Sequence, residues 1–257
     1  MTDVLTFYDI PRKLEGSDQT ELAWSPNTWK TRYVLNIKKI PYKTVWLEFQ
    51  DVEGEMKKLG MPATGVKAGQ PFYTVPTIYD PSTKKAVTDS QEIVFYLESQ
   101  YPSAPSLFPP HTRALQTAFI EANPLLGVFF PLIVADIRDQ CSSEEAKAYF
   151  TETPERWIGR PLEQVVPQGA ARAEKLKELE QTLITLGKWI DANGKDATFI
   201  AGDDTTPSYA DVDVASILIF AKKVVGEQAD VWKTIAGVEE GRWAKYVDAF
   251  DKYATVV

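Results

Sequence analysis

Two short segments of the sequence combine residue types that could hold a small charged peptide. In the first, Val75-Pro76 precedes a β-branched and apolar run, Thr77 to Tyr79. Because proline lacks a ladder donor, a strand here is predicted to begin at Pro76 or to lie at a sheet edge. X-Pro bonds adopt the cis form at a cost of only about 0.5–1 kcal/mol. A cis Val75-Pro76 bond would turn the backbone N–H and C=O of Val75 outward, where an extended peptide could pair with them.

The second segment, Asp89-Ser90, lies where a helix is predicted to begin. Ile93, Val94 and Leu97 follow it and form an apolar stripe at helical spacing. An acid and a hydroxyl at a helix N-terminus can receive an ammonium group and a carboxylate together. The two segments therefore predict a site for a small charged peptide. The alternative is an edge strand followed by an ordinary capped helix.

The elements that must position these segments mix strands and helices in the first hundred residues. A helix is predicted from Pro26 to Lys39, because Ser25 offers an N-cap and Pro26 suits the first helical position. Alternation and β-branched residues predict four strands, at Leu5–Ile10, Val45–Phe49, from Pro76 onward and at Ala86–Thr88. This order predicts an α/β layer, with helices beside a four-stranded mixed sheet.

Helical spacing dominates the rest of the chain. Tyr101 to Pro110 contains four prolines in ten residues, which predicts an extended linker. Ser208-x-x-Asp211 is a capping-box-like start for a helix that is apolar nearly all round. We expect one domain over residues 1–101, a linker over 102–110 and an all-helical domain over 111–257. Its predicted helices are Leu115–Asp136, Ala170–Ala192, Ser208–Val225 and Trp243–Tyr253.

The composition argues against several classes of function. The chain has 36 acidic and 28 basic residues and no basic block, so it lacks a footprint for nucleic acid. Its start resembles no signal peptide, and its apolar runs are too short to cross a bilayer. The single Cys141 and single His111 argue against disulfide frameworks, metal sites and histidine-based triads. We expect a cytoplasmic protein with no metal, nucleic-acid or membrane partner.

Several ordered motifs together resemble the glutathione transferase superfamily over essentially the whole chain. Beside Val75-Pro76 and Asp89-Ser90, Phe199–Asp203 leads into Pro207–Asp211 as it does in that family. Two local motifs, Ser25–Arg32 and Arg156–Glu163, more narrowly resemble the etherase-related, fungal-specific class A transferases. The resemblance implies a thioredoxin-like domain that binds glutathione and an all-helical domain that binds the electrophile. It also implies a homodimer.

The resemblance implies a role for each residue of the two opening segments. Val75 would pair by its backbone with the cysteinyl unit of glutathione, and Pro76 would hold that geometry. Asp89 and Ser90 would take the γ-glutamyl ammonium and carboxylate. The glycine carboxylate also needs a cation or an amide. Four residues lie in the right stretch, and the choice among them stays open: Lys57, Lys58, Lys67 and Gln70.

The resemblance also makes Ser25 the candidate for thiol activation. Lowering a thiol pKa by about two from its usual value near 8.5 needs about 3 kcal/mol. A hydroxyl donating to the thiolate supplies about 1.5–3 kcal/mol, and the positive end of a helix about 0.3–1 kcal/mol more. Serine rather than cysteine at this position points to conjugation or peroxide reduction instead of thiol–disulfide exchange. The alternative is that Ser25 only caps its helix. Cys141 is expected to be structural or incidental, and we assign it no chemistry.

Two long stretches depart from compact members of the superfamily. Pro11–Trp24 is an insert that contains Ser17, a weaker competitor for activation because no helix is expected to begin behind it. Asp51–Tyr73 is longer than one helix needs. Long loops of this kind are commonly functional or mobile, so we expect both to wall and widen the substrate site.

An aromatic stripe in the helical domain is the candidate for binding the electrophile. The proline at 124 predicts a kink that could open space for a ligand. Such stripes are more often plain core, which is the alternative for each residue. The candidates are Phe119, Asn123, Phe129 and Phe130, faced by Tyr8 and Trp24 from the first domain.

Together these features predict a glutathione transferase that takes glutathione as co-substrate and uses no metal. We expect it to conjugate aromatic or phenolic electrophiles, or to reduce hydroperoxides, in detoxification. One alternative is a carrier (ligandin) of aromatic metabolites with little catalysis. Another is a regulatory protein that has kept only the fold.

Overall fold

The computed structural model describes residues 4–195, 197–201 and 205–257, without the side chains of residues 154, 156 and 157. Two motif positions, 202 and 203, and the side chains at 156 and 157 thus lie outside the described residues. Contacts divide the chain into two compact units. The sheet unit comprises the chain up to Pro105, Ile137–Leu162 and Ala254–Val257, and the helical unit comprises Ser106–Asp136 and Glu163–Tyr253. The predicted limits, a first domain that ends at residue 101 and a second that begins at residue 111, are not tested by this division and stay a prediction.

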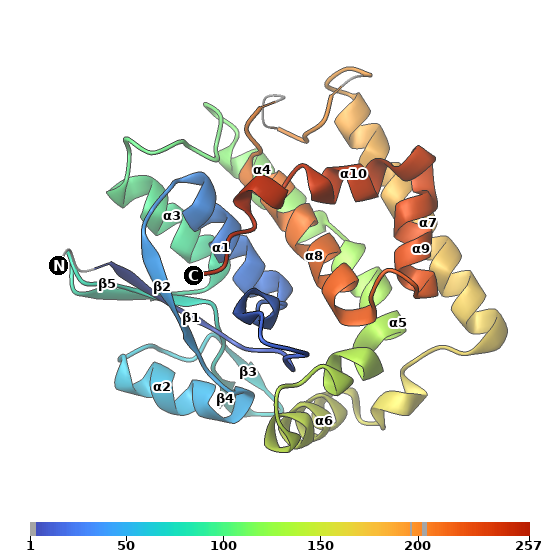
Figure 1. Cartoon of the computed structure of the whole chain (residues 1–257), viewed down its shortest axis with the longest axis horizontal. Helices are drawn as coiled ribbons and strands as arrows, with labels where there is room; N and C mark the ends of the chain where they lie inside the picture. The colour runs from blue at the N-terminus through green and yellow to red at the C-terminus, as the bar shows by residue number, and fades with distance from the viewer. Residues whose placement is uncertain (1–3, 196, 202–204) are drawn as a thin grey trace. The chain divides into compact units, whose positions relative to one another are not determined.

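The sheet unit is built on a four-stranded mixed sheet in the order β2-β1-β5-β6 (Figure 1). β1 runs parallel to β2 and antiparallel to β5, and β5 forms a hairpin with β6. Helices α1 (Pro26–Ile37) and α3 (Ser90–Gln100) pack together on one side of the sheet, and α2 (Val52–Lys58) lies on the other. This is the predicted thioredoxin-like domain. The strands are β1 Leu5–Asp9, β2 Tyr42–Trp46, β5 Thr77–Asp80 and β6 Lys85–Thr88.

The second strand begins earlier than predicted. Its parallel register pairs Tyr42 with Leu5 and Trp46 with Asp9. Because Asp9 is the last residue of β1, the pairing of β2 with β1 ends at Trp46, before Phe49. Phe49 instead begins a 3-10 turn that leads into α2. The long stretch after it also holds a separate two-stranded hairpin that the sequence analysis missed. That hairpin consists of β3 (Gly65–Lys67) and β4 (Gln70–Phe72).

The helical unit is organised around α8 (Tyr209–Val225), which is buried over most of its length and contacts α4, α9 and α10. The expected capping interaction is present at its start. Both the N–H and the hydroxyl of Ser208 donate to the Asp211 carboxylate, at 2.8 and 2.6 Å. The other helices that lie wholly in this unit are α4 Arg113–Ala122, α7 Gly169–Asp191, α9 Asp230–Gly237 and α10 Arg242–Asp248.

The predicted helix over 115–136 is two helices, α4 and α5 (Leu125–Asp139), bent by 42°. Asn123 and Pro124 separate them, because a residue before proline avoids the helical region. The expected kink at Pro124 is therefore a break. Two further helices, α6 (Glu144–Ile158) and α9, were not predicted from the sequence.

We find no single helix in the described ranges that is long and apolar enough to cross a membrane. Helices α4 and α5, taken together as one bent pair, meet the same test of length and composition.

Candidate functional site

Ser25 occupies the N-cap of α1, but in the described part of the chain its hydroxyl makes no cap hydrogen bond. Its carbonyl accepts hydrogen bonds from the Trp29 N–H at 3.0 Å and from the Thr28 hydroxyl at 3.1 Å. Pro26 has no N–H, so the first amides of the helix belong to Asn27 and Thr28. The hydroxyl and these amides stand together at the positive end of α1, an arrangement suited to an anion.

The Val75–Pro76 peptide bond is cis. Across the described ranges, neither the N–H nor the C=O of Val75 takes part in a backbone hydrogen bond. The residues on either side are held instead. The Thr88 hydroxyl lies 3.4 Å from the carbonyl oxygen of Thr74 and 3.3 Å from that of Pro76, and it accepts from Thr77 at 2.9 Å. Within the described ranges the backbone N–H and C=O of Val75 are thus unused by other backbone groups, and their pairing with a ligand stays a prediction.

Asp89 links this segment to α3. Its N–H donates to the Pro76 carbonyl at 3.2 Å, and its carboxylate accepts from the Gln91 and Glu92 N–H groups at 2.8 and 3.2 Å. Its φ of 79° and ψ of 131° form a combination that residues other than glycine rarely adopt. Asp89 is exposed and Ser90 half-buried. The structure thus brings Val75, Pro76, Asp89 and Ser90 together, as the peptide-site hypothesis requires.

Tyr8 and Trp24, the two aromatic candidates in the sheet unit, are both packed. Tyr8 is 8% exposed and shares a cluster with Val75 and Met56. Burial raises the pKa of the Tyr8 phenol, and the charge of Glu55 raises it further. Trp24 is 1% exposed, and its ring meets that of Phe49 edge to face at 6.5 Å.

The four candidates in the helical unit differ in their surroundings. Asn123 donates to the Asp213 carboxylate at 2.8 Å and accepts from the N–H of Leu125 at 3.1 Å, so it organises the break between α4 and α5. Phe129 is 1% exposed, with its ring 6.0 Å from that of Phe220. Phe119 and Phe130 remain half-buried, and Phe119 meets Trp189 edge to face. Their ligand roles stay predictions.

Sequence reasoning missed an aromatic cluster beside Trp24 in the sheet unit. The ring of Phe49 lies parallel to that of Tyr149, with centroids 6.2 Å apart, and 5.8 Å from that of Phe150. All three are half-buried. The signal for this cluster in the sequence was the pair of adjacent aromatic residues, Tyr149 and Phe150, on an amphipathic helix. Their contact with Phe49, a hundred residues earlier, was not visible in any local pattern.

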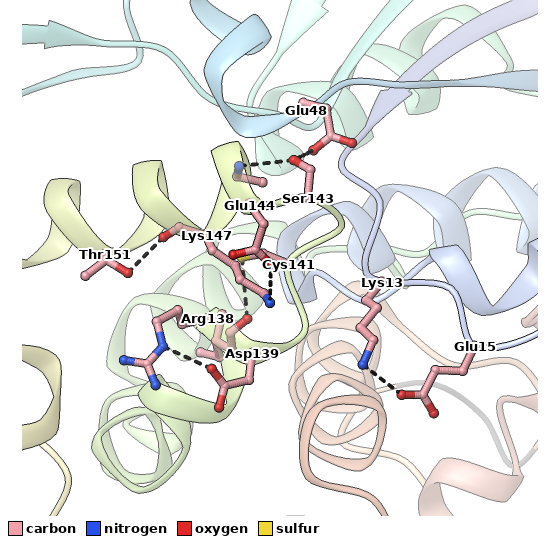
Figure 2. Close-up of polar contacts among 12 residues, drawn as sticks. Lys13, Glu15, Glu48, Arg138, Asp139, Cys141, Ser143, Glu144, Lys147 and Thr151 are labelled. Carbon is pink, nitrogen blue, oxygen red and sulfur yellow. Dashed lines mark hydrogen bonds and ion pairs between the residues drawn. The ribbon is translucent and has the colours of Figure 1, made fainter.

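The Pro11–Trp24 insert is tied to the turn before α6. Bridges pair Pro11 with Ala23 and Arg12 with Cys141, and the N–H of Lys13 donates to the Gln140 carbonyl at 2.7 Å. Figure 2 shows Glu48 meeting Ser143, which caps α6; the hydroxyl lies 3.4 Å from the carboxylate.

The competitor Ser17 lies on the insert. A 3-10 turn, Gln19–Leu22, begins just beyond it and is capped by Asp18. The expectation that no helix begins behind Ser17 therefore holds only for an α-helix.

Cys141 is buried in the same region (Figure 2). Its thiol lies 3.6 Å from the Ile137 carbonyl. Burial raises the pKa of the Cys141 thiol to about 12, with the charge of Glu48 adding to the effect. A thiol with this pKa is not nucleophilic near neutral pH. That Cys141 is structural or incidental stays a prediction.

The contacts of the four candidates for binding the glycine carboxylate of glutathione do not favour one of them over the others. Lys57 pairs with Glu53 at 2.5 Å and Lys58 with Glu55 at 3.1 Å. The ammonium of Lys67 lies 4.3 Å from the Phe72 ring centroid, and burial lowers its pKa. Gln70 is exposed on β4. In the residues that the structure covers, no group of three or more His, Cys, Asp or Glu side chains could hold a metal ion.

Comparison with known proteins identifies the family. A model of the glutathione S-transferase C-terminal domain matches residues 114–253, and one of the N-terminal domain matches residues 24–100. The glutathione transferase GSTFuA3 from Phanerochaete chrysosporium is 38% identical, with 99% of both chains covered and a TM-score of 0.89. A glutathione S-transferase of Ceriporiopsis subvermispora, solved in complex with glutathione, is 36% identical, with 99% of both chains covered and a TM-score of 0.90.

A curated fungal protein agrees. The glutathione S-transferase-like protein ustS of Aspergillus flavus is 28% identical over 252 residues, which cover 93% of this chain and 87% of that protein. These matches confirm the expected resemblance to fungal-specific transferases. The chain belongs to the glutathione S-transferase family and is a glutathione transferase.

Proposed function

We propose that this transferase activates the glutathione thiol through the hydroxyl of Ser25. The observation that carries the proposal is that Ser25 stands at the N-terminus of α1 without using its hydroxyl as a cap, in the part of the chain described. A hydroxyl donor and a helix dipole together can lower a thiol pKa by about two. Activation then needs no general base.

Glutathione binds along the segment that joins Val75 to Asp89. The cysteinyl unit pairs with the backbone of Val75, and the γ-glutamyl ammonium and carboxylate meet Asp89 and Ser90. The hydrogen bond from Asp89 to Pro76 supports this arrangement, because it keeps the two binding elements together. The Ceriporiopsis relative, solved in complex with glutathione, supports the choice of glutathione as the ligand.

The thiolate attacks an electrophilic carbon, a C–S bond forms, and the leaving group departs with its electron pair. With a hydroperoxide, the thiolate attacks the terminal oxygen and the O–O bond breaks. The alkoxide that leaves takes up the proton released when the thiol ionised and becomes an alcohol. A second glutathione then converts the sulfenic product to glutathione disulfide and water. Serine at position 25 offers no sulfur for a mixed disulfide with the enzyme.

The substrates we propose are aromatic or phenolic, within a detoxifying role. The rings of Phe49, Tyr149 and Phe150 support this choice, because they are half-buried and the ring of Phe49 meets that of Trp24, which precedes Ser25. Aromatic rings favour aromatic partners in stacked or edge-to-face contact by about 0.5–1.5 kcal/mol.

A second candidate is carriage of aromatic metabolites with little turnover. Apolar side chains exposed in the helical unit favour it, since Trp189 is 42% and Leu115 72% exposed. Tight binding of hydroxylated aromatic compounds without glutathione-dependent turnover would select this candidate.

The proposal includes a cytoplasmic homodimer. Light scattering should give twice the mass of one chain, and fractionation should recover the protein with soluble cytoplasmic markers. A monomer, or recovery with membranes, would remove the corresponding part of the proposal.

Kinetics of a Ser25→Ala variant test the catalytic role. Loss of the hydroxyl should lower kcat by about 10- to 100-fold, because a hydrogen bond to a charged group contributes about 1.5–3 kcal/mol. Ser17→Ala is the matched control and should behave as the wild type. Unchanged activity in Ser25→Ala would move the catalytic role elsewhere. Failure of the wild type to bind glutathione would favour the regulatory alternative.

A further inference from the structure

A buried ion pair joins the end of β1 to the middle of α1. Arg32 Nη2 lies 2.8 Å from Asp9 Oδ2, and both side chains are 0% exposed. A buried ion pair is weak evidence for stability, because desolvation of both charges offsets their attraction. The chemistry proposed above uses neither group directly. The ion pair could therefore serve to position a neighbouring residue.

The guanidinium of Arg32 is fixed in orientation. Its Nη1 donates to the hydroxyls of Tyr42 and Thr44 at 3.1 and 3.3 Å. The ring centroids of Phe7 and Trp46 lie 5.0 and 5.5 Å from its central carbon. These contacts hold the arginine in place, and the arginine in turn holds the Asp9 carboxylate.

The other oxygen of Asp9 accepts from the N–H of Ile10 at 2.7 Å. Burial raises the pKa of Asp9, whereas the charge of Arg32 and a hydrogen bond from the Thr28 hydroxyl act to lower it. Thr28 is fully buried in the first turn of α1, and its hydroxyl also lies 3.1 Å from the Ser25 carbonyl. A hydroxyl has only one proton. The hydrogen bond that the geometry gives this hydroxyl is therefore the one to the Ser25 carbonyl, with the Asp9 carboxylate as a neighbour.

We infer that Thr28, which neighbours the Asp9–Arg32 ion pair, is a positioning residue for Ser25 through its hydrogen bond to the Ser25 carbonyl. The inference rests on the proposed role of Ser25. By holding the Ser25 carbonyl, the Thr28 hydroxyl fixes the peptide group between Ser25 and Pro26. That peptide group sets the direction in which the Ser25 side chain leaves the backbone. The competing arrangement is the ordinary N-cap, in which the serine oxygen accepts from a first-turn amide and turns away from the ligand.

The same helix supplies a matched control. Thr31 lies one turn later and is 1% exposed, and its hydroxyl has no hydrogen-bond partner in the part of the chain described. Thr28→Val and Thr31→Val therefore make the same chemical change at two buried sites, and only the first removes a contact with Ser25. Thr28→Ser keeps the hydroxyl and serves as the rescue variant.

The experiment measures the pKa of enzyme-bound glutathione from its thiolate absorbance, together with kcat, KM and the melting temperature. Thr28→Val should raise the thiol pKa by about 0.5 to 1 and lower kcat by about 10-fold. KM for glutathione should change less than about twofold, because its binding groups lie on other elements. Thr28→Ser should restore the wild-type pKa, and Thr31→Val should leave pKa and kcat unchanged.

A thiol pKa that is the same in Thr28→Val and Thr31→Val overturns the inference, whatever their melting temperatures. If Thr28→Val does not fold, Thr28→Ala and Thr31→Ala provide the same comparison. Ser25→Ala, measured in parallel, separates the two claims. If Ser25→Ala raises the thiol pKa and Thr28→Val does not, only the positioning role fails. If Ser25→Ala leaves the pKa unchanged, the proposed function fails and this inference fails with it.

Discussion

The backbone N–H of Asp89 donates a hydrogen bond to the carbonyl oxygen of Pro76 at 3.2 Å. This bond joins the N-terminus of α3 to the segment that enters β5. Asp89 holds it with a φ of 79°, which costs a residue other than glycine about 1–3 kcal/mol. Such a conformation persists only where its surroundings maintain it. The hydrogen bond thus joins the two segments proposed to bind glutathione, Val75-Pro76 and Asp89-Ser90, into one connected unit.

Asp89→Asn should separate capping from ligand binding. Asparagine caps a helix about as well as aspartate and tolerates a positive φ, so the melting temperature should change little. The lost charge should weaken glutathione binding by about 10- to 100-fold in calorimetry. Glu92→Gln, an exposed acid in the same helical turn, is the control and should bind normally. Wild-type affinity in Asp89→Asn would remove Asp89 from the site.

Thr88→Val should destabilise the protein. The change removes the one hydroxyl proton that the Thr74 and Pro76 carbonyls share, and it leaves the Thr77 hydroxyl with only the Met56 sulfur as an acceptor in the described residues. We expect a loss of about 1–2 kcal/mol in the free energy of unfolding, measured in urea, and weaker glutathione binding because Val75 is no longer held. Thr88→Ser should retain most of both. An unchanged urea midpoint for Thr88→Val would show that these contacts carry no net free energy.

Cys141 should resist thiol reagents in the native protein. With a pKa of about 12, only about one thiol in ten thousand is ionised at pH 8. A colorimetric thiol reagent should therefore react very slowly with the native protein and titrate the chain's one thiol in denaturant. Pretreatment with glutathione disulfide should leave no mixed disulfide on Cys141, because its thiol is not ionised to attack the disulfide bond. Rapid reaction of the native thiol would contradict the buried position.

Asp230 should contribute stability that depends on pH. Arg172 holds it with two hydrogen bonds of 2.7 Å, which lower the pKa of Asp230 from its ordinary value of 3.8. Because the folded pKa is the lower one, this stability is fully present above the unfolded pKa. It is lost as pH falls through the folded value.

Asp230→Asn should therefore cost about 0.5–1 kcal/mol of unfolding free energy at about pH 7, and this difference should shrink below about pH 4. Urea unfolding at several pH values measures it. Glu174→Gln, an exposed acid on α7, is the control. A difference that stays constant down to about pH 3 would show that the pair is not the cause.

Local signals were sufficient for much of the fold. Pro26, Asp89 and the Ser208–Asp211 cap mark helix starts through contacts within a few residues, and those starts were predicted correctly. The succession of the four main strands along the chain followed from alternation and turn residues, whereas their spatial order in the sheet was not predicted. The peptide-site segments were also visible, because a proline before a strand and an acid at a helix start are local patterns.

What the sequence analysis missed depends on contacts between distant residues. The start of β2 is set by its register with β1, which pairs Tyr42 with Leu5. The contact of Phe49 with Tyr149 and the ion pair of Arg32 with Asp9 likewise join separate elements. Burial likewise distinguishes Phe129, packed in the core, from Phe119, although both have the same residue type.

The central claim is that the Ser25 hydroxyl stabilises the glutathione thiolate. The most direct measurement is the pKa of bound glutathione, from thiolate absorbance across pH, in the wild type and in Ser25→Ala. We predict a wild-type value about two below the free value near 8.5, and a rise of about 1 to 2 in the variant. Equal pKa values in the two proteins would contradict the account.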